Sequence, residues 1–89
     1  MTFEPGAMGN VRLKFFARYA ELVGQDELHL SVTLPATVGD VVRQARSEIP
    51  GASGIPERPL AALNLRHVRL DAPVQDGDEV AFLPPLAGG

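Results

Sequence analysis

The chain ends in two glycines that follow a pair of prolines, and this end offers chemistry that the side chains do not. Its last residues are Pro84-Pro85-Leu86-Ala87-Gly88-Gly89. A terminal carboxylate is a poor electrophile, but transfer of AMP from ATP would make it a mixed anhydride open to attack by a sulfur or nitrogen nucleophile. Gly88 and Gly89 carry no side chains, so this main chain can thread a narrow channel in another protein. We therefore expect the carboxylate of Gly89 to be the reactive group.

The prolines before the glycines favour an extended path for the tail. Pro84 and Pro85 cannot continue a strand ladder or fold back as a helix. The six residues 84–89, at about 3.3 Å each, would let Gly89 stand about 20 Å from the body, far enough to enter another protein's active site. A C-terminal diglycine alone is weak evidence, because chain ends commonly fray. The diglycine gains meaning only from the folded body that precedes it.

The composition argues against several other kinds of chemistry. The 89 residues suffice for one domain, and the net charge of −3 without a basic stripe predicts no nucleic-acid partner. The chain has no cysteine, which excludes disulfides, thiolate metal sites and thioesters on its side chains. His29 and His67 form no metal motif, and we expect both to be surface strand residues, with no bound metal or cofactor. There is no long apolar run or signal sequence, so we expect a cytoplasmic protein without a membrane partner.

Alternating apolar residues predict a hairpin at the start of the body. The first strand should begin at Val11, and the second should span residues 28–34. Between them, residues 17–23 have the composition of a short helical turn, and Gly24 is well placed to cap it because glycine tolerates a positive φ.

One amphipathic helix should follow the hairpin. Thr37 and Asp40 form a shortened capping box, with the threonine hydroxyl placed to accept from the backbone of Asp40. Apolar residues then recur at helical spacing over residues 38–49. This apolar stripe needs a sheet to cover, and Phe15 and Phe82 are expected to face it.

Short strands complete the predicted body. Residues 60–64 should form a third strand, residues 68–70 should continue or pair with it, and residues 79–83 should form the last strand after a turn at 76–77. A helix crossing one face of a mixed four- to five-stranded sheet is the economical way to bury these faces. We therefore predict an α+β fold of the ubiquitin-like β-grasp type. The predicted organisation is a flexible leader at 1–10, the β-grasp domain at 11–83 and the extended tail at 84–89.

In this fold the first and last strands are neighbours, which has a consequence for the face that the helix leaves uncovered. Alternation places Phe16 and Leu83 together on that face, flanked by Lys14 and His67. Leaving two such apolar side chains in water forgoes roughly 1.5–3 kcal/mol of burial each, so we expect a partner to cover them. The alternative is that they are isolated exposed apolar residues, which are common.

The chain resembles the MoaD family, the small sulfur-carrying subunits of molybdopterin synthase. The run from Asp71 to Gly89 is similar to the family's C-terminal signature, and the segment from Val11 to Gly24 is similar to its first strand and turn. Thr37-Val38 also begins the helix where the family's helix begins. The resemblance covers residues 11–89.

The resemblance implies a specific role for the tail. An ATP-consuming enzyme similar to ubiquitin activators would adenylate Gly89, and a sulfur donor protein would convert it into a thiocarboxylate. The large subunit of the synthase would supply the catalytic side chains and pass the sulfur to cyclic pyranopterin monophosphate. The uncovered sheet face would dock the partners through Phe16, His67 and Leu83, although His67 departs from the apolar residue usual there.

Three alternatives remain open at this stage. The chain could carry sulfur for another pathway, such as thiamine synthesis, tRNA thiolation or cysteine synthesis. It could be a ubiquitin-like modifier that forms isopeptide bonds through Gly89. It could also be a β-grasp interaction module with an inert tail.

Overall fold

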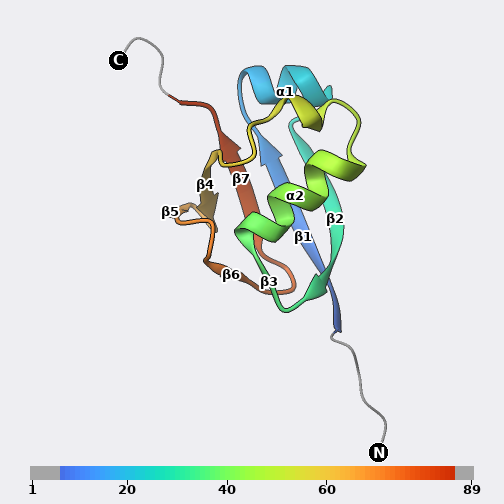
Figure 1. Cartoon of the computed structure of the whole chain (residues 1–89), viewed down its shortest axis with the longest axis vertical. Helices are drawn as coiled ribbons and strands as arrows, with labels where there is room; N and C mark the ends of the chain where they lie inside the picture. The colour runs from blue at the N-terminus through green and yellow to red at the C-terminus, as the bar shows by residue number, and fades with distance from the viewer. Residues whose placement is uncertain (1–6, 86–89) are drawn as a thin grey trace, which may run out of the picture.

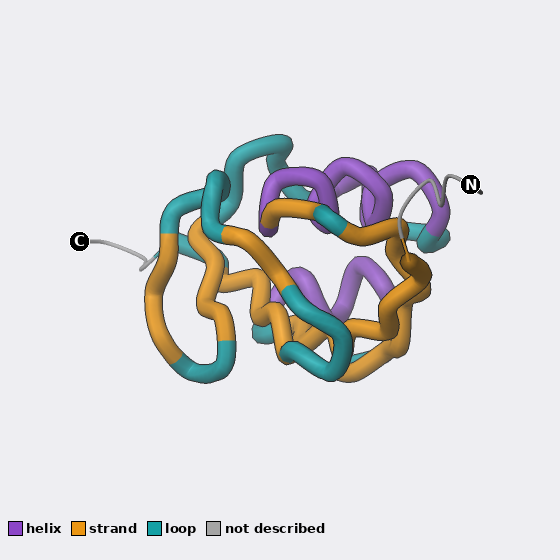
Figure 2. The backbone as a smooth tube through the Cα atoms, turned by 90° about the horizontal axis from the view of Figure 1, so that it is seen from below, coloured by secondary structure: helices purple, strands orange, loops and turns teal. Residues whose placement is uncertain are grey.

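The computed structural model describes residues 7–85, which form two sheets and two α-helices. The larger sheet is mixed and five-stranded, with the order β2-β1-β7-β4-β5, and the smaller pairs β3 with β6. The elements are β1 (Ala7–Phe15), α1 (Arg18–Val23), β2 (Glu27–Leu34), β3 (Ala36–Thr37), α2 (Val38–Glu48), the 3-10 turn η1 (Ala52–Gly54), β4 (Leu60–Leu63), β5 (Arg66–Val68), β6 (Pro73–Val74) and β7 (Glu79–Leu83). Helix α2 crosses one face of the larger sheet (Figures 1 and 2). The predicted β-grasp arrangement is confirmed.

Strand β7 is the middle strand of the larger sheet. It runs parallel to β1, with Arg12 opposite Glu79 at one end of the pairing and Phe15 opposite Phe82 at the other. Along its second edge it pairs antiparallel with β4. The last described strand is thus bonded on both sides, and the expected adjacency of the first and last strands is confirmed.

Two phenylalanines lie at the centre of the core between sheet and helix. Phe15 and Phe82 are each 1% exposed. Their ring centroids lie 5.5 Å apart with an interplanar angle of 70°, the edge-to-face contact that aromatic rings favour. The buried side chains of α2 complete this layer: Val38, Val41, Val42 and Ala45. Both rings face the helix, as the sequence predicts.

The start of α2 is fixed by a reciprocal capping box. The hydroxyl of Thr37 accepts a hydrogen bond from the Asp40 amide at 3.1 Å, and the Asp40 carboxylate accepts from the Thr37 amide at 2.9 Å. The bond from the Thr37 backbone is the main reason that the pKa of Asp40 lies below its ordinary value, and Arg43 adds to this effect. The predicted helix start is confirmed at the level of individual atoms.

Strand β1 begins earlier than the sequence predicts. Residues 7–10 pair with the second half of β2, so the predicted leader boundary at residue 10 is wrong for these four residues. Gly9 is part of the reason that the alternation is hard to see, because it is buried without a side chain. A Cβ on Gly9 would stand 2.6 Å from Cδ1 of Leu34, so a side chain there would displace the end of the Leu34 side chain. Residues 1–6 lie outside the described residues.

The two-stranded sheet was not predicted. Ala36 pairs with Val74 and Thr37 with Pro73, which ties the entry of α2 to the segment before β7. Strands of two residues carry no measurable periodicity, so only the folded chain shows them. The turn that follows contains Gly77 with φ of +89°, consistent with the turn expected at 76–77.

The capping box predicts a pH-dependent stability. Asp40→Ala should lower the free energy of unfolding by about 1 kcal/mol near neutral pH, because the Thr37 amide loses its acceptor. A lowered folded-state pKa means that this stabilisation is complete above the unfolded pKa, ordinarily 3.8, and is lost as the pH falls through the folded value. Urea unfolding of the wild type and of Asp40→Ala, measured from neutral pH into acid, should show the difference in their free energies of unfolding disappearing at low pH.

Asp40→Asn is the matched control, because it keeps an acceptor oxygen without the charge. It should lose less stability at neutral pH than Asp40→Ala. An Asp40→Ala gap that stays constant from neutral pH into acid would contradict a role for the carboxylate.

Candidate functional site

The predicted reactive tail leaves the body at a fixed point. Strand β7 ends at Leu83, and the chain continues through a half-buried Pro84 and an exposed Pro85. Strands β1 and β7 point toward the same end of the molecule, where α1 lies (Figure 1). The residues predicted to thread a channel and to react, Leu86, Ala87, Gly88 and Gly89, lie outside the described residues.

An apolar row lies on the outer sheet face, where the tail begins. Leu83 is half-buried and sits opposite Leu60, which is 52% exposed. Phe16, 46% exposed, is the first residue after β1, whose last residue, Phe15, pairs with Phe82. The structure therefore places Leu60 opposite Leu83, and the predicted grouping of Phe16 with Leu83 stays a prediction. Sequence reasoning missed Leu60 because only the register between β4 and β7 reveals which residue faces Leu83.

The next pair of residues on the outer face, between β4 and β7, has small side chains. Ala62 lies opposite Ala81, and both are buried. Lys14 is the other partner of Ala81, and His67 is the other partner of Ala62. His67 is exposed, as predicted, but it lies on β5 at the sheet edge, two strands away from Leu83. Its place in the predicted docking set is therefore peripheral.

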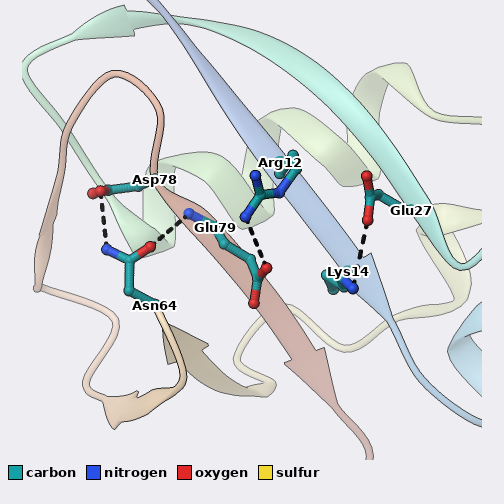
Figure 3. A network of polar contacts seen from close by, with 6 residues as sticks. All are labelled: Arg12, Lys14, Glu27, Asn64, Asp78 and Glu79. Carbon is teal, nitrogen blue, oxygen red and sulfur yellow. Dashed lines mark hydrogen bonds and ion pairs between the residues drawn. The ribbon is translucent and has the colours of Figure 1, made fainter.

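Polar contacts surround this pair of small side chains. Figure 3 shows six of these side chains, with α2 behind the strands: Arg12, Lys14, Glu27, Asn64, Asp78 and Glu79. Arg12 pairs with Glu79 at 3.0 Å, and Lys14 pairs with Glu27 at 3.5 Å. Exposed ion pairs of this kind contribute about 0–1 kcal/mol, so a partner could displace them at little cost.

The amide of Asn64 joins two polar groups of β7 and the turn before it. Its nitrogen donates to the Asp78 carboxylate at 3.0 Å, and its oxygen accepts from the Glu79 amide at 2.9 Å. These bonds fix the turn between β4 and β5 against the start of β7. The outer face thus has an ordered polar end and an apolar end.

The hollow between α2 and the loop after it is a weaker candidate for chemistry. It has a volume of about 650 Å³, and its lining includes Arg43, Arg46 and Arg58. Arg46 donates to the carbonyl of Ile55 at 2.7 Å, and Arg43 pairs with Asp40, so two of the three guanidinium groups already have structural partners. Between residues 7 and 85, no cluster of three or more His, Cys, Asp or Glu side chains could hold a metal ion. The apolar end of the outer face, next to the tail, is the stronger candidate site.

No helix within the described part of the chain is both long and apolar enough to cross a membrane.

Sequence comparisons place the chain among small proteins of similar length. A sequence model described as the ThiS family matches residues 13–89. The molybdopterin synthase sulfur carrier subunit of Escherichia coli is 38% identical over 82 residues, which cover 89% of this chain and 99% of that protein. Small archaeal modifier protein 3 of Haloferax volcanii is 36% identical over 90 residues, which cover 89% of this chain and 98% of that protein.

Solved structures agree on the fold. The crystal structure of SAMP1 from Haloferax volcanii superimposes with a TM-score of 0.79 at 28% identity, covering 91% of this chain and all of that one. The structure of a putative molybdopterin converting factor, subunit 1, from Pyrococcus furiosus has a TM-score of 0.74 at 27% identity. The superposition covers 88% of this chain and 99% of that one. The similarity therefore extends over almost the whole of each protein.

Proposed function

This chain belongs to the ThiS family, and from that premise we propose that it is a sulfur carrier in molybdopterin biosynthesis. An ATP-dependent activating enzyme, similar to ubiquitin activators, adenylates Gly89. A sulfur donor protein then converts the adenylate into a thiocarboxylate. The terminus enters the large subunit of molybdopterin synthase and donates its sulfur to cyclic pyranopterin monophosphate. The chain is not an enzyme by itself and binds no cofactor in this scheme, because the activating enzyme consumes the ATP.

Each of the two activation steps forms one bond at the terminus and breaks another. A carboxylate oxygen of Gly89 attacks the α-phosphorus of ATP, and pyrophosphate leaves. The donor supplies the sulfur as hydrosulfide, which attacks the carbonyl carbon. The carbon–oxygen bond to AMP breaks, AMP leaves, and the proton of the hydrosulfide passes to water. The chain contributes only its terminal carboxylate, and its side chains hold that group on a stable body.

The observation that carries the proposal is the relative at 38% identity, which is named a sulfur carrier subunit and which this chain matches over 99% of its length. The geometry adds support, because β7 is bonded along both edges and leads directly into the proline spacer. A carrier needs a terminus that projects from a rigid body, and this strand gives the tail a fixed origin.

We further propose that the apolar end of the outer face docks the large subunit. Leu60 and Leu83 lie beside the origin of the tail, and Phe16 follows the end of the neighbouring strand β1. A partner seated there would receive Gly89 within the reach of six residues, about 20 Å. His67, at the far edge, would contribute to the rim of such an interface, where contacts are worth less.

A protein modifier is the second candidate function. It is supported by the relative at 36% identity, which is named a small archaeal modifier protein. Both functions require an activated Gly89 and differ in the nucleophile that receives it. A carrier for another sulfur pathway would differ only in the final acceptor.

The terminal glycine provides the first test. Deletion of Gly89 should abolish sulfur transfer to the pterin precursor, because the activating enzyme and the large subunit would receive a shortened terminus. Thermal stability should stay within experimental error, since β7 and the core end before the tail. Transfer at the wild-type rate would refute the role of Gly89, and a large drop in melting temperature would show that the tail belongs to the fold.

The docking face provides the second test. Leu83→Asp should weaken binding to the large subunit at least about tenfold, or about 1.4 kcal/mol, because it places a charge where an apolar contact is expected. Titration calorimetry would measure the affinity. Ser31→Asp is the matched control, because Ser31 is exposed on β2 away from the apolar row. Equal affinities for Leu83→Asp and the wild type would remove this row from the interface.

The two candidate functions predict different cellular products. A tagged chain purified from its host under denaturing conditions should be free of covalent protein adducts if it is a carrier. A modifier should instead leave residues 70–89 as a branch on lysines of other proteins after tryptic digestion, because Arg69 is the last basic residue of the chain. Abundant branches that depend on Gly89 would favour the modifier.

A further inference from the structure

The hollow between α2 and the loop after it gathers positive charge, although the net charge of the chain is −3. Arg43 and Arg46 line it from α2, and Arg58 lines it from the loop. Among the described residues that line the hollow, Glu57 is the only acidic one. The lining therefore carries more positive than negative charge on a chain that is acidic as a whole.

Arg46 holds one wall of the hollow in place. Its Nε donates to the carbonyl of Ile55 at 2.7 Å, and its Nη2 donates to the carbonyl of Ser53 at 3.3 Å. Ala52 and Ile55 are buried in the core, so the loop that carries these carbonyls is anchored at both ends of η1. The wall is thus formed before any ligand arrives, and binding would not have to order it.

The charge of Arg46 is only weakly compensated. The two carbonyls that it contacts are neutral. Its carboxylate partner, Glu57, lies 3.7 Å from Nη1, and the Glu57 side chain is 80% exposed. An exposed ion pair of this kind contributes little to stability, so an anion in the hollow could take the place of the Glu57 carboxylate.

The other two guanidinium groups lie on the exposed side of the hollow. Arg58 is exposed, and the structure gives it no ion pair with any residue between 7 and 85. Arg43 is 69% exposed and pairs with Asp40 one turn earlier on α2. Ser47 and Ser53 add hydroxyl groups to the lining. Guanidinium forks and hydroxyls are donors that bind phosphate oxygens.

The size of the hollow favours a small ligand. Its volume of about 650 Å³ lies within the range of small-molecule sites, about 300–1,000 Å³. One guanidinium group can bind one phosphate through two parallel N–H donors, so arginines on opposite sides of the hollow match two linked phosphates. The lining comes from α2, one loop and Leu70, which makes a compact hollow and not the long groove that an acidic segment of a protein would need.

We propose that this hollow binds a diphosphate group, either free as pyrophosphate or carried by a nucleoside. Arg46 holds one phosphate from the fixed wall, and Arg43 and Arg58 close over the other from the exposed side. The site is built on α2, which covers the face of the sheet opposite the outer face (Figure 2), so both faces can be occupied at once. This inference does not depend on the proposed function.

NMR titration of the full chain tests the proposal, with pyrophosphate, ADP and orthophosphate added in separate series. Pyrophosphate should give saturable shifts of the Ser53 and Glu57 amides with a Kd below about 1 mM. ADP should bind at least as tightly if the nucleoside form is the ligand, and more weakly if the free anion is. Orthophosphate reaches one side of the hollow only and should bind at least about tenfold more weakly.

Variants separate this site from general attraction by charge. Arg58→Gln and Arg43→Gln should each weaken pyrophosphate binding at least about threefold, because each removes a charged donor. Glu57→Gln should strengthen binding, because the lining loses its carboxylate. Arg66→Gln is the matched control, since Arg66 is exposed on β5 and outside the lining. Arg46 stays unchanged, because its loss would also release the loop.

Four results would overturn the inference. These are shifts that do not saturate, an affinity that Arg58→Gln leaves unchanged, equal weakening by Arg66→Gln, and orthophosphate binding as tight as that of pyrophosphate. The activating enzyme provides a further comparison. If no anion binds but Arg58→Gln weakens the affinity for that enzyme, the hollow is a protein-docking surface and the diphosphate site is refuted.

Discussion

The structure depends on β7 being hydrogen-bonded along both of its edges. The strand lies between β1 and β4, and Phe82 within it packs edge-to-face on Phe15. The strand that holds the sheet together is therefore also the strand that ends in the tail. Because Leu83 pairs with Leu60 of β4 and follows Phe82, which is paired on both sides, the sheet holds the origin of the tail in place. A carrier that must present its terminus to several partners benefits from such a fixed origin.

Alternation along this one strand separates stability from recognition. Val80 and Phe82 point into the core, and Leu83 points to the outer face, where Leu60 faces it. A change on the outer side can therefore alter partner binding with little effect on folding. The ion pairs on the same face contribute little to stability, so a partner could replace them with its own charged groups without unfolding the chain. In the proposed docking, the apolar row next to the tail would supply most of the binding free energy of this face.

Local signals in the sequence were enough to predict the fold, whereas features that depend on pairing between distant segments were not. The alternation in β1 and β7 and the capping box at Thr37 each lie within a few residues. The pairing of Ala36 with Val74 and the exposure of Leu60 depend on which strands meet, which no local pattern encodes. Gly9 obscured the start of β1 because it has no side chain and so interrupts the apolar alternation. The reactive terminus at Gly89 stays a prediction, because it lies outside the described residues.

The central claim is that Gly89 carries sulfur, and the mass of the intact chain tests it most directly. The chain would be mixed with ATP, the activating enzyme and sulfide, and its C-terminal fragments would be weighed. The account predicts that one oxygen of the Gly89 carboxylate is replaced by sulfur, with no change elsewhere in the chain. An unchanged terminus, in a reaction where the enzyme does release pyrophosphate, would contradict it.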